Sequence, residues 1–120
     1  MNQMKKTVLV IDDEIDLCAL IRLVFMRENF RVECATSLAE AALKLPARPD
    51  IILLDNNLPD GLGIEFYHNH PRAFEESYNV MMSADGSERI RSRAKKEGID
   101  EFIQKPFTIQ KMKDIISKTK

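Results

Sequence analysis

Short apolar runs alternate with segments of helical periodicity along the whole chain, and this alternation predicts the order of its elements. The run at 7–11 is continuously apolar, which suits a strand that is buried on both faces. The run at 31–35 alternates instead, with Val32 and Cys34 on one side. The expected strands cover 7–11, 31–35, 51–54, 80–82 and 102–104.

Between the strands, apolar residues recur every three or four positions, which predicts helices with one buried stripe each. The expected inward residues are Leu17, Leu20, Ile21, Val24 and Phe25 in the first helix, Leu38, Ala41, Ala42 and Leu45 in the second, and Ile109, Met112, Ile115 and Ile116 in the last. Ser37, with Glu40 three residues later, predicts a capping box at the start of the second helix. Thr108 is the expected cap of the last helix.

The segments on either side of the fourth strand are less regular. A helix that begins at Ile64 should break or kink at Pro71, so we expect a short helix and an irregular approach to the strand. Residues 87–97 form a highly charged helix with only Ile90 and Ala94 as apolar anchors. This helix is therefore expected to be held in place more weakly than the others.

Strands that alternate with helices predict one sheet of parallel strands joined by right-handed crossovers, with helices on both faces. The chain has 120 residues, which fits a single domain and leaves no room for a second. Residues 1–120 are therefore expected to form one α/β domain.

Composition narrows the classes of function. The formal net charge of -1 gives no electrostatic footprint for nucleic-acid binding by this domain. No apolar run approaches the ~20 residues that span a bilayer, so no membrane segment is expected. The first residues lead straight into an apolar strand without a small-residue cleavage site, which favours a cytoplasmic protein without a signal peptide. Cys18 and Cys34 lack CxxC spacing and are expected to be reduced core residues.

Polar side chains stand where four of the predicted strands end. Asp12 and Asp13 follow the first strand, Asp55 the third, Ser83 the fourth and Lys105 the fifth. The carboxyl ends of parallel strands share one edge of a sheet, and ligands of such sheets bind outside that edge. These side chains are therefore candidates for one site. Taken alone, the acidic pair could instead cap the first helix.

The residue types at this edge suit phosphoryl transfer. Converging carboxylates repel one another unless a cation intervenes, and Mg²⁺ prefers oxygen ligands. Lys105 supplies a compact positive charge and Ser83 a hydroxyl donor. A carboxylate nucleophile, a metal ion, a cation and a hydroxyl together can position and neutralise a phosphoryl group.

Four motifs in this order resemble the response-regulator receiver domains of two-component signal transduction. They are Val-Leu-Val-Ile-Asp-Asp-Glu at 8–14, Ile-Leu-Leu-Asp-Asn-Asn-Leu-Pro-Asp-Gly-Leu-Gly at 52–63, Met-Met-Ser-Ala at 81–84, and Phe-Ile-Gln-Lys-Pro-Phe at 102–107. The resemblance implies a five-stranded, flavodoxin-like doubly wound sheet of order 2-1-3-4-5. It also implies a cis bond between Lys105 and Pro106. The order is taken from known domains of this type and not from this sequence.

The resemblance also implies a role for each site residue. Asp55 would accept a phosphoryl group from a sensor histidine kinase or a phosphotransfer protein. Mg²⁺ would be bound by Asp13 directly, by Asp12 largely through water, by Asp55, and by the backbone carbonyl of Asn57. Ser83 and Lys105 would hold phosphoryl oxygens. The switch residues would be Ser83 and Phe102.

As implied by the resemblance, the protein would be a signalling switch and not a general enzyme. Helix 87–97, the fifth strand and the last helix would form its partner-binding surface. The downstream protein partner is unknown, and a phosphorylation-dependent homodimer is left open.

Two rival functions compete with this interpretation. A hydrolase of the haloacid-dehalogenase type would need Asp-x-Asp at its nucleophile, whereas Asn56 and Asn57 follow Asp55. A pseudo-receiver that binds partners without phosphorylation usually lacks an acid or the lysine, and this chain keeps both.

Other features of the sequence have simpler explanations than a second site. His68 and His70 stand two residues apart and do not share a helix face, which favours exposed structural histidines over metal ligands. The basic run at 89–96 is flanked by acidic residues, so a solvated helix is favoured over a nucleic-acid patch.

Overall fold

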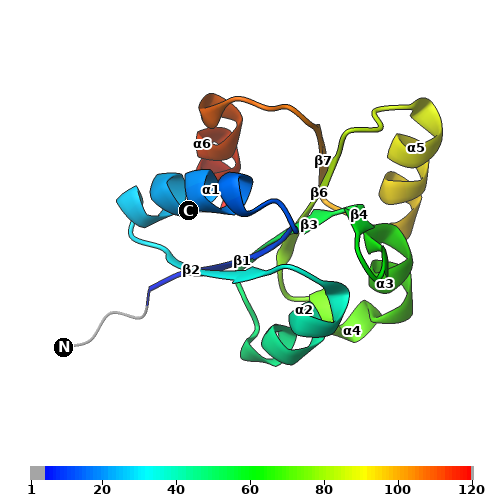
Figure 1. Cartoon of the computed structure of the whole chain (residues 1–120), viewed down its shortest axis with the longest axis horizontal. Helices are drawn as coiled ribbons and strands as arrows, with labels where there is room; N and C mark the ends of the chain where they lie inside the picture. Colours follow the sequence, from blue (N-terminus) through cyan, green and yellow to red (C-terminus); the bar gives the residue numbers. More distant parts are fainter. Residues whose placement is uncertain (1–4, 120) are drawn as a thin grey trace.

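The computed structural model describes residues 5–119 as one α/β domain (Figure 1). The strands are β1 (Thr7–Ile11), β2 (Arg31–Ala35), β3 (Ile51–Asp55), β4 (Asn57–Leu58), β5 (Gly61–Leu62), β6 (Tyr78–Ser83) and β7 (Glu101–Gln104). The helices are α1 (Ile15–Arg27), α2 (Leu38–Lys44), the 3-10 helix η1 (Leu45–Ala47), α3 (Gly63–Asn69), α4 (Pro71–Phe74), α5 (Glu88–Glu97) and α6 (Ile109–Lys118). The expectation about a signal peptide concerns in part residues 1–4, which lie outside this range.

The large sheet has five parallel strands in the order β2-β1-β3-β6-β7. Because β4 and β5 form a separate hairpin, this order is the predicted 2-1-3-4-5 arrangement of the main strands. The antiparallel hairpin between β4 and β5 was not predicted, since each of its strands has only two residues. It follows β3 directly and lies next to the carboxyl edge of the sheet.

Two layers of helices cover the sheet, which confirms the doubly wound architecture. Helices α1 and α6 lie on one face and α2, α3, α4 and α5 on the other (Figure 1). Alternate residues of each central strand point to the two faces: Ile51 and Leu53 face α1 and α6, whereas Ile52 and Leu54 face the other layer. The sheet is therefore buried on both sides, and its polar groups can reach solvent only at the strand ends.

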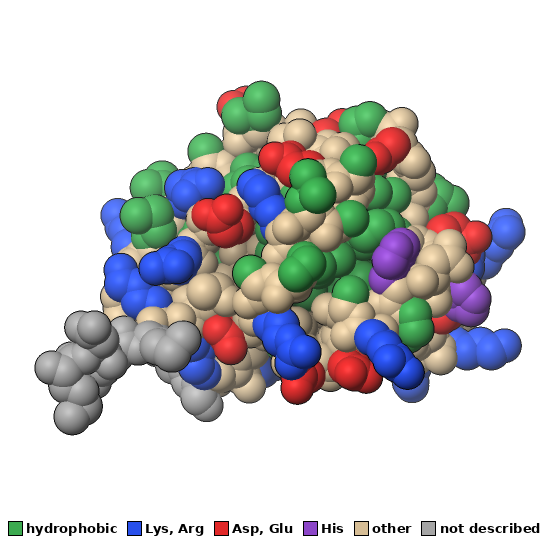
Figure 2. Space-filling view, turned by 90° about the horizontal axis from the view of Figure 1, so that it is seen from below, with side chains coloured by type: hydrophobic (Ala, Val, Ile, Leu, Met, Phe, Trp, Pro, Cys, Tyr) green, Lys and Arg blue, Asp and Glu red, His purple; other side chains and the backbone are tan. Residues whose placement is uncertain are grey.

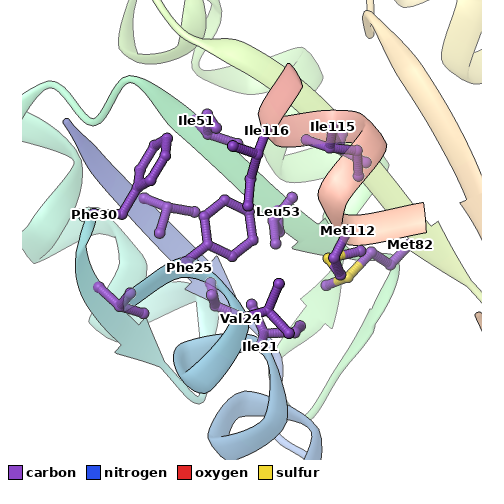
Figure 3. Packing of buried hydrophobic residues seen from close by; sticks show 14 of the residues in the cluster. Ile21, Val24, Phe25, Phe30, Ile51, Leu53, Met82, Met112, Ile115 and Ile116 are labelled. Carbon is purple, nitrogen blue, oxygen red and sulfur yellow. The ribbon is translucent and has the colours of Figure 1, made fainter. Parts of the chain in front are cut away.

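The core beneath α1 and α6 is formed around two aromatic rings (Figure 3). Phe25 and Phe30 meet edge to face with ring centroids 5.2 Å apart. Ile115 and Ile116 reach this core from α6, as the sequence predicts. Apolar contacts thus hold both helices firmly against the sheet, and the amino end of α1 is held close to the end of β1.

Three of the predicted inward residues are exposed in the structure. Leu20, Ala42 and Ile109 all face solvent. On α1, Ile21, Val24 and Phe25 are buried as predicted, and Cys18 joins them in place of Leu20. Four apolar residues of α1 are exposed, and they form its outer row: Ile15, Leu20, Leu23 and Met26.

The helix ends follow local sequence signals with one difference. The Ser37 hydroxyl accepts a hydrogen bond from the Glu40 backbone N–H, as a capping box requires, but the Glu40 carboxylate accepts from Thr36 instead of Ser37. Thr108 caps α6 as predicted. Pro71 divides the third helical segment, because α3 ends before it and the short α4 begins with it.

The face that carries α2 and α4 mixes both signs of charge (Figure 2). Lys and Arg side chains stand there between Asp and Glu, with apolar side chains among them. Within residues 5–119, no helix has the length and apolar character needed to cross a bilayer.

Candidate functional site

Four strands of the large sheet end in polar side chains at its carboxyl edge. Asp12 and Asp13 follow β1, Asp55 ends β3, Ser83 ends β6 and Lys105 follows β7. Asp12, Asp55 and Ser83 are buried, Lys105 is half-buried and Asp13 is exposed. Each of the three carboxylates places an oxygen within 4.8 Å of the other two. The three acids that the strand ends predicted therefore lie together, while Ser83 stands at the end of the neighbouring strand β6.

Lys105 links the three strands that carry its partners. Its Nζ donates to Asp12 Oδ2 at 2.6 Å and to Glu14 Oε1 at 2.9 Å, and it lies 3.4 Å from Asp55 Oδ2. Its backbone N–H donates to the Ser83 carbonyl at 2.8 Å, which fixes the residue beside β6. The peptide bond between Lys105 and Pro106 is cis, as the resemblance implies.

The pKa values at the site are shifted because the carboxylates of Asp12 and Asp55 are both buried and lie close together. Burial raises the pKa of Asp55 to about 6, and repulsion from Asp12 adds to the rise while Lys105 opposes it. Burial alone would lower the pKa of Lys105, but its hydrogen bonds to Asp12 and Glu14 outweigh that effect and hold the pKa above its ordinary value. The negative charge of the clustered carboxylates therefore exceeds the positive charge of the one ammonium group beside them.

The acidic pair contributes to the start of α1 as well as to the site. Asp12 Oδ1 accepts a hydrogen bond from the Glu14 backbone N–H at 2.8 Å, while Oδ2 of the same carboxylate faces Lys105. The helix-cap alternative is not borne out, because the N-cap of α1 is Glu14 without a side-chain cap, and the Asp12 oxygen bonds the backbone N–H of that residue in the turn before the helix. Asp13 has its side chain in solvent and is free to turn toward a ligand.

The loop after Asp55 is held by a buried amide that sequence reasoning missed. The Asn56 side chain is 7% exposed, and its Oδ1 accepts from the Ile64 backbone N–H at 3.0 Å. Its backbone carbonyl accepts from Gly63 N–H at 2.8 Å. A Cβ added at Gly63 would lie 2.3 Å from the Asp55 carbonyl oxygen, so only glycine fits there. These contacts hold the loop that follows Asp55, and the backbone N–H of Asn57 in this loop donates to Asp55 Oδ1 at 3.4 Å.

The two predicted switch residues lie on adjacent strands, two register positions apart. Ser83 is the last residue of β6, and its Oγ accepts a hydrogen bond from the Asp85 backbone N–H at 3.1 Å. Phe102 on β7 pairs with Met81, and the Arg91 guanidinium lies 4.6 Å from the centroid of its ring. Phe102 is half-buried, with the Arg91 guanidinium of α5 over its ring.

The two histidines have separate structural partners. His68 Nδ1 lies 2.9 Å from Glu97 Oε1, and His70 Nδ1 lies 2.8 Å from the Phe66 carbonyl. Within residues 5–119, Asp12, Asp13 and Asp55 form the one group of three or more His, Cys, Asp or Glu side chains that is arranged to hold a metal ion. All the donor atoms are carboxylate oxygens, the ligand type that hard divalent cations prefer. The residues present therefore fit such a cation.

Comparison with known proteins gives one consistent family. The model of the response regulator receiver domain matches residues 8–117. The transcriptional regulatory protein ResD of Bacillus subtilis (strain 168) is 36% identical over 110 residues, which cover 90% of this chain and 45% of ResD. Sporulation initiation phosphotransferase F of the same organism is 28% identical over 116 residues, which cover 96% of this chain and 94% of that protein. This chain thus spans about half the length of some curated relatives and nearly the whole of another.

Solved structures share the fold across the whole domain. The chemotaxis response regulator CheY4 of Vibrio cholerae superposes with a TM-score of 0.87 at 23% identity, covering 98% of this chain and all of that one. This likeness shows the fold alone, which is the flavodoxin-like arrangement expected from the sequence. The non-phosphorylated HemR receiver domain of Leptospira biflexa has a TM-score of 0.87 at 25% identity and covers 96% of this chain and 94% of its own. The chain belongs to the response regulator receiver domains, the signalling switches of two-component phosphorelays.

Proposed function

We propose that Asp55 accepts a phosphoryl group from a phosphohistidine on a sensor histidine kinase or a phosphotransfer protein. The observation that carries this proposal is the convergence of Asp12, Asp13 and Asp55 beside Lys105 at one edge of the sheet. The Asp55 carboxylate accepts from the Asn57 backbone N–H, and Lys105 Nζ lies 3.4 Å from its Oδ2. A nucleophile held this way needs little reorganisation before it reacts.

In this mechanism an Asp55 carboxylate oxygen attacks phosphorus as the bond from phosphorus to the donor imidazole nitrogen breaks. The leaving imidazole nitrogen becomes neutral, and the new acyl phosphate stays on Asp55. Lys105 stabilises the negative charge on the phosphoryl oxygens, and the Ser83 hydroxyl donates to one of them. The haloacid-dehalogenase alternative lacks support, because its Asp-x-Asp motif needs a second acid at position 57, which is Asn57 here. Asn56, between the two, uses its buried amide to hold the loop.

Mg²⁺ is the proposed cofactor. Asp12, Asp13, Asp55 and the backbone carbonyl of Asn57 would hold it, and it would neutralise charge on the phosphoryl oxygens. The three clustered carboxylates and the raised pKa of Asp55 support this assignment, since both reflect a shortage of positive charge. Lys105, which is paired with Asp12 and Glu14, would then be released toward the phosphoryl group.

The outer row of α1 is the proposed contact surface for the phosphodonor protein. Ile15 is 74% exposed and Leu23 62% exposed, and α1 begins directly beyond the acidic pair. A donor histidine can reach Asp55 only from the carboxyl edge, so a protein that presents it must cover neighbouring elements. Exposed apolar side chains beside a charged site suit such a contact.

The proposed output surface comprises α5, β7 and α6. Of the residues in α5, only Ala94 is buried, and Ile90 is half-buried, so few apolar contacts hold this helix. Ser83 would turn from the Asp85 N–H toward the phosphoryl group, and Phe102 would then rotate inward, which frees Arg91. A downstream protein would recognise the altered surface. Phosphorylation-dependent pairing of two copies through it stays open, and no nucleic-acid contact by this domain is proposed.

Incubation with Mg²⁺ and acetyl phosphate should raise the intact mass by one phosphoryl group. Asp55→Asn should abolish the rise, because the nucleophilic carboxylate is lost. Asp114→Asn on α6 makes the same change of charge far from the site and should leave the rise intact. A persistent adduct in the Asp55 variant, or steady release of phosphate without any adduct, would rule out the proposed role of Asp55.

Replacement of one acid by its amide should weaken Mg²⁺ binding. We expect Asp13→Asn to lower the affinity by about tenfold or more, since one anionic ligand is lost. Asp12→Asn should act less strongly. Asp16→Asn, three residues beyond Asp13, is the matched control and should change little. Isothermal titration calorimetry measures the Mg²⁺ affinity of all three variants. An unchanged affinity in the Asp12/Asp13 double variant would show that the pair does not bind the metal ion.

A polar substitution in the outer row of α1 should slow phosphoryl transfer from a protein donor but not from a small-molecule donor. Leu23→Ser is expected to slow transfer from a phosphorylated histidine kinase by about tenfold, the effect of losing ~1.4 kcal/mol of apolar contact. Transfer from acetyl phosphate should be unchanged, because a small donor needs no docking surface. Leu43→Ser on α2, where Leu43 is 83% exposed, serves as the control. If the kinase transfers the phosphoryl group to both variants at the same rate, α1 is not part of the docking surface.

Beryllofluoride with Mg²⁺, which mimics a phosphoryl group, should shift amide NMR signals from Ser83 to Phe102 more than those of α1 and α2. The physical reason is that only Ala94 of the ten residues of α5 is buried, so this helix shifts at low cost. Phe102→Ala should leave phosphorylation nearly unchanged and weaken binding of a downstream partner. Shifts confined to the acidic loops, with none beyond Gly86, would contradict the proposed switch.

A further inference from the structure

Helices α3 and α5 lie side by side (Figure 1), and polar side chains join them. Glu65 and His68 stand three residues apart on α3, and Arg93 and Glu97 stand four apart on α5, so each pair shares one face of its helix. Arg93 Nη2 donates to Glu65 Oε1, and Arg93 Nε lies 4.0 Å from Glu97 Oε2. His68 Nδ1 lies 2.9 Å and 3.0 Å from the two Glu97 oxygens. These four side chains form one connected network, the α3–α5 bridge.

Few other contacts hold α5 against the domain. Its apolar contacts come from Ala94, which is buried, and Ile90, which is half-buried. On the side toward β7, the Arg91 guanidinium lies 4.6 Å from the centroid of the Phe102 ring, and Arg91 Nε donates to the Gly86 carbonyl at 3.0 Å. With so few apolar contacts, polar contacts have a large influence on where this helix lies.

Helix α3, in contrast, is fixed to the loop that follows Asp55. The backbone N–H of Gly63 donates to the Asn56 carbonyl at 2.8 Å, and that of Ile64 donates to Asn56 Oδ1 at 3.0 Å. Ile64 and Phe66 are buried beneath the helix. The α3–α5 bridge therefore attaches a weakly held helix to a firmly held one that begins beside the carboxylate cluster.

We propose that Glu65 and His68 are positioning residues that hold α5 in its resting place and so set how readily phosphorylation moves it. This inference rests on the proposed function, in which α5 shifts when Asp55 is phosphorylated. Polar contacts as short as those of His68 are lost when one helix moves away from the other. A contact made only in the resting state opposes any ligand that favours the shifted state, and its removal must raise the affinity for that ligand.

The expected effect is modest, because the side chains of the bridge are partly exposed. The side chain of Glu97 is 22% exposed and that of His68 59%. Solvent weakens such contacts, so the loss of one cross-helix pair should change the balance between the two positions of α5 by about two- to fivefold. The two pairs together should have a larger effect than either alone.

Hydrogen exchange in the unphosphorylated chain tests whether the bridge holds α5. In Glu65→Gln and in His68→Gln, the α5 amides should exchange about two- to fivefold faster than in the unaltered chain, and those of α1 should not change. Glu76→Gln is the matched control, because Glu76 forms a comparable exposed ion pair with Arg48, at 2.6 Å, outside both helices. Unchanged α5 exchange in the Glu65/His68 double variant would overturn the proposal.

Titration with beryllofluoride at saturating Mg²⁺ tests whether the bridge opposes the switch. The Glu65/His68 double variant should bind this phosphoryl mimic more tightly than the unaltered chain, whereas Glu76→Gln should bind it equally well. A general loss of stability would not tighten binding, so this readout separates a positioning role from a merely structural one. Equal or weaker binding in the double variant would overturn the proposal.

A double-variant cycle tests the cross-helix pair itself. If Glu65 acts through Arg93, then Glu65→Gln should add little to the effect of Arg93→Gln on α5 exchange and on beryllofluoride affinity. Fully additive effects would show that Glu65 does not act through this pair, against the proposal. If beryllofluoride shifts no α5 signals in the unaltered chain, the proposed function is wrong, whereas the exchange experiment still decides whether the bridge holds α5.

Discussion

Two buried carboxylates share one corner of this domain, and the rest of the site is arranged around the repulsion between them. Asp12 is fully buried and Asp55 nearly so, and burial prevents water from screening their charges. Lys105 can relieve the repulsion only because the last strand carries it to the same edge. The amide of Asn56 holds the loop that follows Asp55, and the absence of a side chain at Gly63 lets this loop pack against the Asp55 backbone.

The helices differ in how many apolar contacts hold them against the sheet, so some are expected to move more easily than others. Helices α1 and α6 share a core with Phe25, Phe30 and the apolar residues of the central strands. On the other face, α5 is anchored by Ala94 and the half-buried Ile90 and otherwise relies on ion pairs such as that between Arg93 and Glu65. Exposed ion pairs contribute little and rearrange easily. We therefore expect a charge change at the strand ends to move α5 more readily than α1.

Much of this arrangement could be predicted from the sequence, because strand burial and strand ends leave strong local signals. The apolar runs located all five main strands, and the polar residues that follow them located Asp12, Asp55 and Lys105. The phase of a helix is harder to predict, since apolar residues outnumber the buried positions; Leu20 is exposed for that reason. Asn56 was missed because its role depends on a contact with Ile64, which no spacing rule encodes.

The ion pair between Lys105 and Asp12 joins residues that are 93 positions apart in the chain. Contacts of such long sequence separation form late, because most of the chain must already be ordered before the two ends can meet. The acidic corner thus exists only after β7 has docked against β6. A nascent or partly folded chain carries every acidic residue and yet lacks the assembled site. Assembly of this corner therefore requires that the whole five-stranded sheet has formed.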